Sequence, residues 1–280
     1  MHSCIVCKSD NIGILYAGLF KCEECGHVFA ALDMDNKSVG ELYGKSYFFG
    51  EEYKDYVADK EVLARNFAMR FDTLKKYLSP EQHQRLLEIG SAYGFFLNFI
   101  RNSFTASLGI DVAEEGVRYA REQLHLNVVH GDFLQFDFAD QEFDVVCLWD
   151  TIEHLCDPQL YIEKISRLTR SGSLIAITTG DISSIIASLK REKWRLIHPP
   201  THIHYFSKES LTRLLNSYGF DVVYNKYCGF FRSNDNILHN VFVIRKKKDW
   251  IYRSLKRMRL TRGTFYLNLY DIMYVIARRR

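Results

Sequence analysis

Residues 86–94 have the sequence LLEIGSAYG, and this stretch decides the predicted fold of the chain. Its first four residues form a short, largely apolar run that is typical of a buried strand, and a turn with two glycines follows directly. Gly90 would let a ligand approach bare backbone, and the helix expected to begin at Gly94 would offer its N-terminal amides. The stretch therefore predicts a strand, a ligand-binding loop and a helix, in that order.

Strands and helices alternate around this stretch. Apolar runs predict strands over residues 86–90, 107–110, 128–129, 143–149 and 174–178. Helical periodicity and end signals predict helices over residues 60–78, 94–103, 113–124, 160–168 and 207–218. Two closing strands, 220–227 and 237–245, have no helix between them and should pair antiparallel. The pattern predicts an α/β fold with a mostly parallel sheet whose last strand is antiparallel and whose faces carry helices.

Asp111 ends the second predicted strand, 21 residues after Gly90. Ligands of parallel sheets bind at the carboxyl ends of the strands, and a carboxylate there can accept both hydroxyls of a ribose. A dinucleotide-binding fold would use the same carboxylate. However, the Gly-x-Gly-x-x-Gly fingerprint is absent, which disfavours a nicotinamide cofactor.

In these features the chain resembles the class I S-adenosylmethionine-dependent methyltransferases over roughly residues 60–245. The sequence from Glu88 to Gly94 is similar to the acidic-Gly-x-Gly-x-Gly loop of that family, with Ala92 in place of the middle glycine. Residues 131–133 (GDF) resemble the pair that reads the adenine, and residues 143–155 resemble the fourth strand with its "EHL" continuation. The resemblance implies a Rossmann-like methyltransferase sheet, an enzyme, and S-adenosylmethionine as the cofactor.

The resemblance also implies which residues bind the cofactor. They are Glu88, Gly90, Ser91, Ala92, Gly94, Asp111, Val112, Asp132, Phe133 and Asp150. Methyl transfer needs few side chains, because the sulfonium supplies the electrophile while the protein positions the acceptor and removes a proton. His154, just after the fourth strand, is the first candidate base; its alternative role is to pack and cap a helix start. An inactive relative that kept the fold is the alternative for the whole domain.

Residues 180–206 form a long connection, and long loops in compact domains are usually functional. Their second half resembles the "Trp … His-x-x-Tyr-Phe-Ser" stretch that covers the acceptor pocket in many methyltransferases of this subgroup. His202, His204 and Tyr205 are therefore candidate catalytic or pocket-lining residues. The two histidines could also hold a metal, but no convincing third ligand is close in the sequence. A structural turn fixed by Pro199 and Pro200 is the other alternative.

The first 30 residues contain four of the seven cysteines as two Cys-x2-Cys hooks, Cys4/Cys7 and Cys22/Cys25. Two such hooks give the tetrahedral sulfur set that zinc prefers, with a small hairpin between them. We therefore predict a structural zinc ribbon, and the alternative is a set of free or disulfide-bonded cysteines. A closed four-thiolate site has no open position for a substrate, so the ribbon would not carry the chemistry.

The C-terminal segment is strongly basic. Residues 245–280 contain twelve Lys and Arg against two Asp, a net charge of +10, and the total of +3 leaves −7 for residues 1–244. Basic and apolar residues alternate at helical spacing after Trp250, which suits an anionic membrane surface. The alternatives are a helix that packs on the domain or on a second copy in a homodimer, and a contact with RNA.

The predicted organisation is a zinc ribbon (1–30), an aromatic connector or cap (31–60), a methyltransferase domain (61–245) and a basic amphipathic helical tail (246–280). No signal peptide or transmembrane run is evident, so we expect the cytoplasm or the inner face of the membrane. The predicted function is methylation of O or C in a small-molecule acceptor: a sugar, a surface-polysaccharide precursor, or a lipid or quinone precursor. The alternatives are an RNA methyltransferase and a non-catalytic cofactor-binding module.

Overall fold

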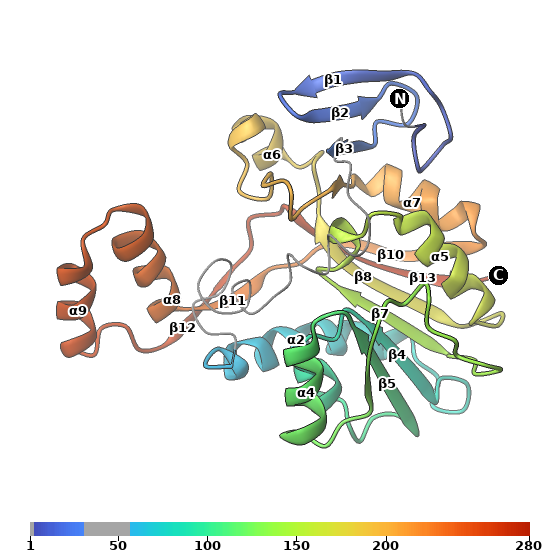
Figure 1. Cartoon of the computed structure of the whole chain (residues 1–280), viewed down its shortest axis with the longest axis horizontal. Helices are drawn as coiled ribbons and strands as arrows, with labels where there is room; N and C mark the ends of the chain where they lie inside the picture. The colour runs from blue at the N-terminus through green and yellow to red at the C-terminus, as the bar shows by residue number, and fades with distance from the viewer. Residues whose placement is uncertain (1–2, 31–56) are drawn as a thin grey trace.

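A seven-stranded sheet forms the centre of the computed structural model, which describes residues 3–30 and 57–280 (Figure 1). Its strand order is β10-β13-β8-β7-β4-β5-β6. The strands are β4 (Arg85–Ile89), β5 (Ala106–Asp111), β6 (Val128–His130), β7 (Val145–Trp149), β8 (Leu174–Gly180), β10 (Phe220–Tyr227) and β13 (Ile272–Arg279). Six of these strands run in the same direction, and β13 runs in the opposite direction between β10 and β8. The predicted connector lies outside the described residues up to position 56.

Helices cover both faces of the sheet. They are α2 (Lys60–Leu74) with a 3-10 turn η2 (Lys75–Tyr77), α3 (Phe95–Phe99), α4 (Glu114–Glu122), α5 (Pro158–Arg167) and α7 (Lys208–Ser217). Successive residues of β7 point to opposite faces, so Val146 and Val145 belong to two different core clusters. Ile162 of α5 joins the first cluster and Phe71 of α2 joins the second. A strand buried on both faces explains the continuous apolar run in the sequence.

The strand that closes the central sheet is not the one predicted from the sequence. Residues 237–245 were expected to close the sheet, but they lie in α8 (Asn234–His239) and a π-helix η5 (Asn240–Arg245). The closing strand is β13, which pairs antiparallel with β10 and β8. The prediction of a helical tail over residues 246–280 is correct only for α9 (Asp249–Arg257). The rest of the predicted tail is wrong, because it contains the strands β12 (Thr264–Leu267) and β13. Both segments are apolar runs of similar length, and periodicity alone cannot tell a buried strand from a buried helix.

The N-terminal hairpin is present as β1 (Ile12–Tyr16) and β2 (Leu19–Cys22), followed by β3 (Val28–Ala30). The long connection after β8 contains α6 (Ile185–Lys190), the 3-10 turn η4 (Arg191–Lys193) and the short strand β9 (His204–Tyr205). β9 pairs with β3, so the acceptor-loop segment completes the sheet of the ribbon. Leu19 and Val28 share a small core with Ala187 and Trp194 from this connection.

Between β10 and β13 the chain forms an arm of two strands and two helices. The strands β11 (Phe230–Ser233) and β12 (Thr264–Leu267) pair antiparallel, and α8 and α9 lie at their far end, away from the central sheet (Figure 1). Within the described residues, no helix has the length and apolar character needed to cross a membrane.

Candidate functional site

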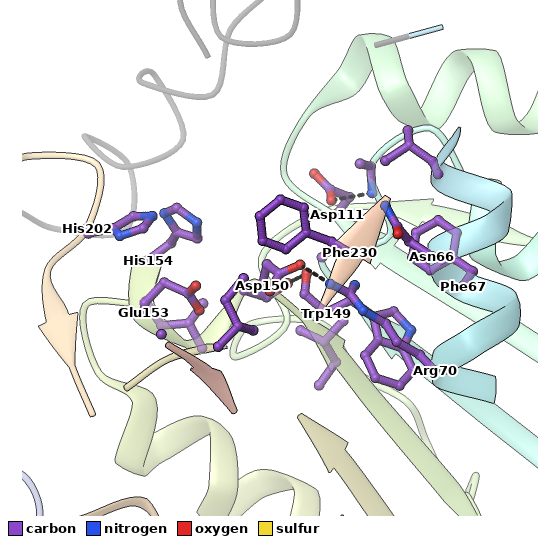
Figure 2. A pocket seen from close by; sticks show the side chains of 18 of the residues that line it. Asn66, Phe67, Arg70, Asp111, Trp149, Asp150, Glu153, His154, His202 and Phe230 are labelled. Atoms are coloured by element: carbon purple, nitrogen blue, oxygen red, sulfur yellow. Dashed lines mark hydrogen bonds and ion pairs between the residues drawn. The ribbon is translucent and has the colours of Figure 1, made fainter. Parts of the chain in front are cut away.

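One cavity of about 310 Å³ opens at the carboxyl ends of the central strands (Figure 2). The ends of β4, β5 and β7 form its floor, α2 and β11 form one wall, and the loop 195–202 forms another. This is the edge of the sheet at which parallel α/β folds bind their ligands.

The predicted glycine loop lies against this cavity in a left-handed conformation. Gly90, Ala92 and Gly94 have φ values of 77°, 45° and 72°. A Cβ at Gly90 would lie 2.5 Å from Thr151 Oγ1, so this position has no room for a side chain. Asp111 fixes the loop, because its carboxylate accepts the amide hydrogens of Ala92 and Ala113, both at 2.7 Å. Burial raises the pKa of Asp111 even against these hydrogen bonds.

The predicted cofactor residues separate into two groups. Gly90, Ala92, Asp111, Val112, Asp132, Phe133 and Asp150 line the cavity. Glu88, Ser91 and Gly94 do not: Ser91 Oγ lies against Gly109 and Gly94 lies against Leu126. Glu88 is buried, and burial raises its pKa well above the ordinary value. These three residues therefore pack within the fold and do not face the cavity.

Asp132 and Phe133 occupy the far end of the cavity. Asp132 accepts hydrogen bonds from the Leu134 amide at 2.9 Å and the Tyr161 hydroxyl at 3.3 Å. Phe133 is 2% exposed and stacks on Tyr161 with ring centroids 5.2 Å apart. The ammonium of Lys164 donates to the carbonyl of Phe133 at 2.8 Å. A flat apolar wall beside a carboxylate fits an adenine with its exocyclic amine.

An ion pair between Arg70 and Asp150 crosses the floor of the cavity, and Arg70 was not predicted as a site residue. Arg70 Nη2 lies 2.7 Å from Asp150 Oδ2, and the guanidinium lies beside the Trp149 ring. Thr178 donates a further hydrogen bond to Asp150 at 3.0 Å. Burial raises the pKa of Asp150, but the charge and hydrogen bond of Arg70 outweigh it, so the pKa is lowered.

Two of the four predicted catalytic residues line the cavity. His154 and His202 are in contact, with ring centroids 4.6 Å apart, and Glu153 lies beside them (Figure 2). Burial lowers the pKa of His154 to about 4, so its ring is neutral at physiological pH. Burial also raises the pKa of the Glu153 carboxyl to about 8. The expectation that the pair His202 and His204 has no convincing third metal ligand nearby is wrong for His202, because folding brings Glu153 and His154 to it.

His204 and Tyr205 lie outside the cavity lining. A ring nitrogen of His204 lies 3.1 Å from His27 Nε2 in the ribbon, and its other nitrogen lies 3.2 Å from the Cys156 carbonyl. Tyr205 donates its hydroxyl hydrogen to the His202 carbonyl at 2.9 Å. These contacts assign His204 to ribbon docking and make Tyr205 a positioning residue for His202.

The wall formed by α2 and β11 was not predicted. Asn66 donates to the Phe231 carbonyl at 3.1 Å and accepts from the Phe231 amide, which joins two segments 165 residues apart. Phe67 and Phe230 line the cavity beside this contact. Neither segment carries a sequence motif, so only the folded structure shows that both line the cavity.

The four cysteines of the ribbon converge. The sulfur atoms of Cys4 and Cys25, and those of Cys7 and Cys22, are each 3.5 Å apart. All four lie within 4.8 Å of one another and none is in a disulfide. A tetrahedral zinc site with bonds of about 2.3 Å separates its sulfurs by about 3.8 Å. The cluster therefore fits the predicted structural zinc.

The fold and this site define the class of Rossmann-like class I methyltransferases. The profile of the methyltransferase domain family matches residues 61–225, so the chain belongs to that family, whose cofactor is S-adenosylmethionine. The residues present fit this group, because acidic and aromatic side chains line the cavity beside a glycine loop that a Cβ would obstruct.

Comparison with known proteins agrees with this class. A probable S-adenosylmethionine-dependent methyltransferase of Mycolicibacterium smegmatis is 27% identical over 140 residues, covering 49% of this chain and 52% of that protein. A ubiquinone biosynthesis O-methyltransferase of Cereibacter sphaeroides is 26% identical over 177 residues, covering 59% and 72%. The chain thus spans about half the length of the first relative.

Solved structures show the same fold. Magnesium protoporphyrin IX methyltransferase from Synechocystis, solved with bound S-adenosylhomocysteine, superposes with a TM-score of 0.57 at 11% identity, over 88% of this chain and all of that one. A possible histamine N-methyltransferase from Thermotoga maritima gives 0.55 at 16% identity, over 84% and 98%. At these identities the likeness extends to the fold alone.

Proposed function

We propose that the protein transfers a methyl group from S-adenosylmethionine to an oxygen or carbon atom of a small-molecule acceptor. The observation that carries the proposal is a single cavity with two unlike walls. Figure 2 shows Asp111 on one side of the cavity, whereas His154 and His202 stand on the opposite side. A cofactor and an acceptor can therefore meet in one enclosure.

The cofactor supplies the electrophilic methyl group, and the residues of the chain bind and orient. In this proposal Asp111 accepts the ribose hydroxyls, while Asp132 and Phe133 hold the adenine. The backbone of Gly90 and Ala92 lies along the remainder of the cofactor. The neutral imidazole of His154 faces the acceptor and can accept its proton.

The proposed acceptors are sugars, surface-polysaccharide precursors, and lipid or quinone precursors. The relative from Cereibacter sphaeroides is a ubiquinone biosynthesis O-methyltransferase, which favours oxygen as the methylated atom. The cavity of about 310 Å³ also favours a compact acceptor over a folded macromolecule.

Two accessory features complete the proposal. We propose that the ribbon holds a structural zinc through Cys4, Cys7, Cys22 and Cys25. We also propose that the basic arm approaches an anionic membrane surface, where lipid-linked acceptors are found. Trp250 and Met258 are 69% and 59% exposed on α9 or directly after it, among exposed basic residues.

The test is label transfer from methyl-tritiated S-adenosylmethionine into a fractionated lysate, with calorimetry of S-adenosylhomocysteine binding alongside. We expect heat on binding and label in the nucleotide-sugar or lipid fraction, both lost in Asp111→Ala. The matched control is Asp140→Ala, an exposed aspartate away from the cavity. Label in RNA would replace the small-molecule acceptor with a nucleic acid. Cofactor binding with no label in any fraction would favour a binding module.

A further inference from the structure

Glu153, His154 and His202 form a three-residue cluster at the acceptor side of the cavity. Each offers one ligand atom, and the three atoms lie within 4.8 Å of one another. The side chains come from η3 (Ile152–His154) and from the loop before β9, and they point toward one another (Figure 2). The cluster is distinct from the four cysteines of the ribbon.

The two histidines are held by the contacts that orient metal ligands. His154 Nδ1 lies 2.8 Å from the Thr201 carbonyl, and His202 Nδ1 lies 2.8 Å from the Leu196 carbonyl. A carbonyl only accepts, so the Nδ1 atom that faces it carries the proton in each ring. A histidine ligand almost always donates its second nitrogen to a carbonyl or carboxylate in this way.

The carboxylate is also held, but on one side. Glu153 is only 5% exposed, and the Thr179 hydroxyl donates to its side chain. Its Oε2 atom is buried and has no hydrogen-bond partner among the described residues. None of the ion pairs found in the described part of the chain involves Glu153. This buried carboxyl oxygen therefore keeps an unused acceptor position that a cation could fill.

The loop that carries His202 is fixed to the element that carries Glu153. The Ile203 amide donates to the Glu153 carbonyl at 2.9 Å, and Tyr205 holds the His202 carbonyl. Tetrahedral zinc would bring such donors to about 3.4 Å of one another, so from within 4.8 Å they need to close by at most about 1.4 Å.

We infer that Glu153, His154 and His202 bind one divalent transition-metal cation of the zinc class, with its remaining coordination positions facing the acceptor. Two imidazoles and one carboxylate favour zinc, iron, cobalt or nickel over magnesium and calcium. The open positions would take an oxygen atom of the acceptor. This binding of the acceptor by the cation rests on the proposed methyl transfer. With a cation bound, the two imidazoles hold the metal and no longer act as bases.

Cobalt substitution of the full-length protein tests the inference, because the two metal sites differ in their spectra. Cobalt in the ribbon gives sulfur-to-metal charge-transfer bands, whereas a site of two nitrogens and one oxygen gives only ligand-field bands. We expect two cobalt ions per chain in the natural protein. Glu153→Gln and His202→Gln should each lose the ion without charge-transfer bands, with affinity at that site at least about a hundredfold weaker.

A variant outside the ligand set gives a second readout. Thr179→Val removes the hydroxyl that holds Glu153 and should weaken cobalt binding about ten- to a hundredfold. Glu192→Gln, at an exposed position, is the control and should leave both ions in place. Binding of S-adenosylhomocysteine by each variant verifies that it is folded.

The outcomes separate the two proposals. One cobalt ion per chain, with charge-transfer bands only, would overturn the second site even if S-adenosylhomocysteine binds. Two ions in a protein that binds no S-adenosylhomocysteine would support the metal site and contradict the proposed methyl transfer. Two ions that persist in Glu153→Gln and His202→Gln would also overturn the assignment of ligands.

Discussion

A single glycine in α4 controls how closely this helix approaches the glycine loop. Gly116 lies in α4 directly over that loop, and a Cβ there would lie 2.7 Å from the Ala92 carbonyl oxygen. The obstructing atoms belong to the backbone, so they cannot rotate away. The same loop is tied to Asp111 through the Ala92 amide. A single methyl group at position 116 would therefore displace the atoms that form the cofactor side of the cavity.

We predict that Gly116→Ala weakens S-adenosylhomocysteine binding about tenfold. Overpacking costs about 1–3 kcal/mol, and about 1.4 kcal/mol corresponds to a factor of ten in affinity. Titration calorimetry measures the effect. Arg118→Ala, an exposed position in the same helix, is the control and should bind as the natural protein does. Equal affinities of the two variants would show that the loop tolerates the displacement.

Secondary-structure elements are joined at the cavity by the pair of Arg70 in α2 and Asp150 after β7. The Arg70 side chain is 8% exposed and that of Asp150 is 43% exposed. Tyr274 of β13 donates to the Arg70 carbonyl at 3.1 Å, so three elements meet at this residue. The pair should therefore stabilise more than an exposed ion pair does, although solvent screens its acidic partner.

Arg70→Met should lower the free energy of unfolding by about 1–3 kcal/mol at neutral pH. The lowered pKa of Asp150 means that this contribution is present above the ordinary aspartate pKa and is lost as the pH falls through the lowered value. The difference between variant and natural protein should therefore shrink in acid. Urea unfolding at several pH values measures it. Lys75→Met, which breaks the exposed pair with Asp72, should cost less than about 1 kcal/mol at any pH.

At the scale of the whole molecule, the ribbon and the acceptor wall form one unit. β3 pairs with β9, and the buried nitrogens of His27 and His204 lie 3.1 Å apart. His204 in turn contacts the carbonyl of Cys156, which lines the cavity. A structural metal in the ribbon would thus support the wall that carries His202, even though it lies outside the cavity.

Removal of zinc with a chelator should expose the amides of β9 and α6 to hydrogen exchange, while β4 and β5 keep their protection. The reason is that β9 would lose its strand partner and α6 its small core, whereas the core on the α2 side of the central sheet contains no ribbon residue. Exchange measured by mass spectrometry, with zinc restored as the control, tests this. Unchanged protection of β9 would mean that the ribbon is not stabilised by metal.

The basic arm should bind anionic vesicles in a salt-dependent manner. Lys246, Lys247 and Lys248 are exposed, and each contributes about 1 kcal/mol near such a surface. Replacing all three with Gln should therefore lower sedimentation with phosphatidylserine vesicles by at least tenfold. The control replaces Lys190, Arg191 and Lys193, which are exposed near the ribbon, and should bind normally. Equal loss in both variants would indicate nonspecific charge attraction.

The sequence alone determined the features that depend on neighbouring residues. The run 86–94 specifies a strand, a loop and a helix, and Asp111 ends the next strand as predicted. The capping box of α7 is also local, because its two side chains, Ser207 and Ser210, lie three residues apart. The cysteine hooks converge as expected, because each hook is a single turn.

Only the tertiary structure decided which apolar run closes the sheet and which polar groups meet at the acceptor wall. Residues 237–245 and β13 have similar composition, and the choice depends on which run can pair with both β10 and β8. His202 meets Glu153, and α2 meets β11, across long sequence separations that carry no local pattern. Such contacts are selected by the free energy of the whole fold, so they become visible only when the chain is folded.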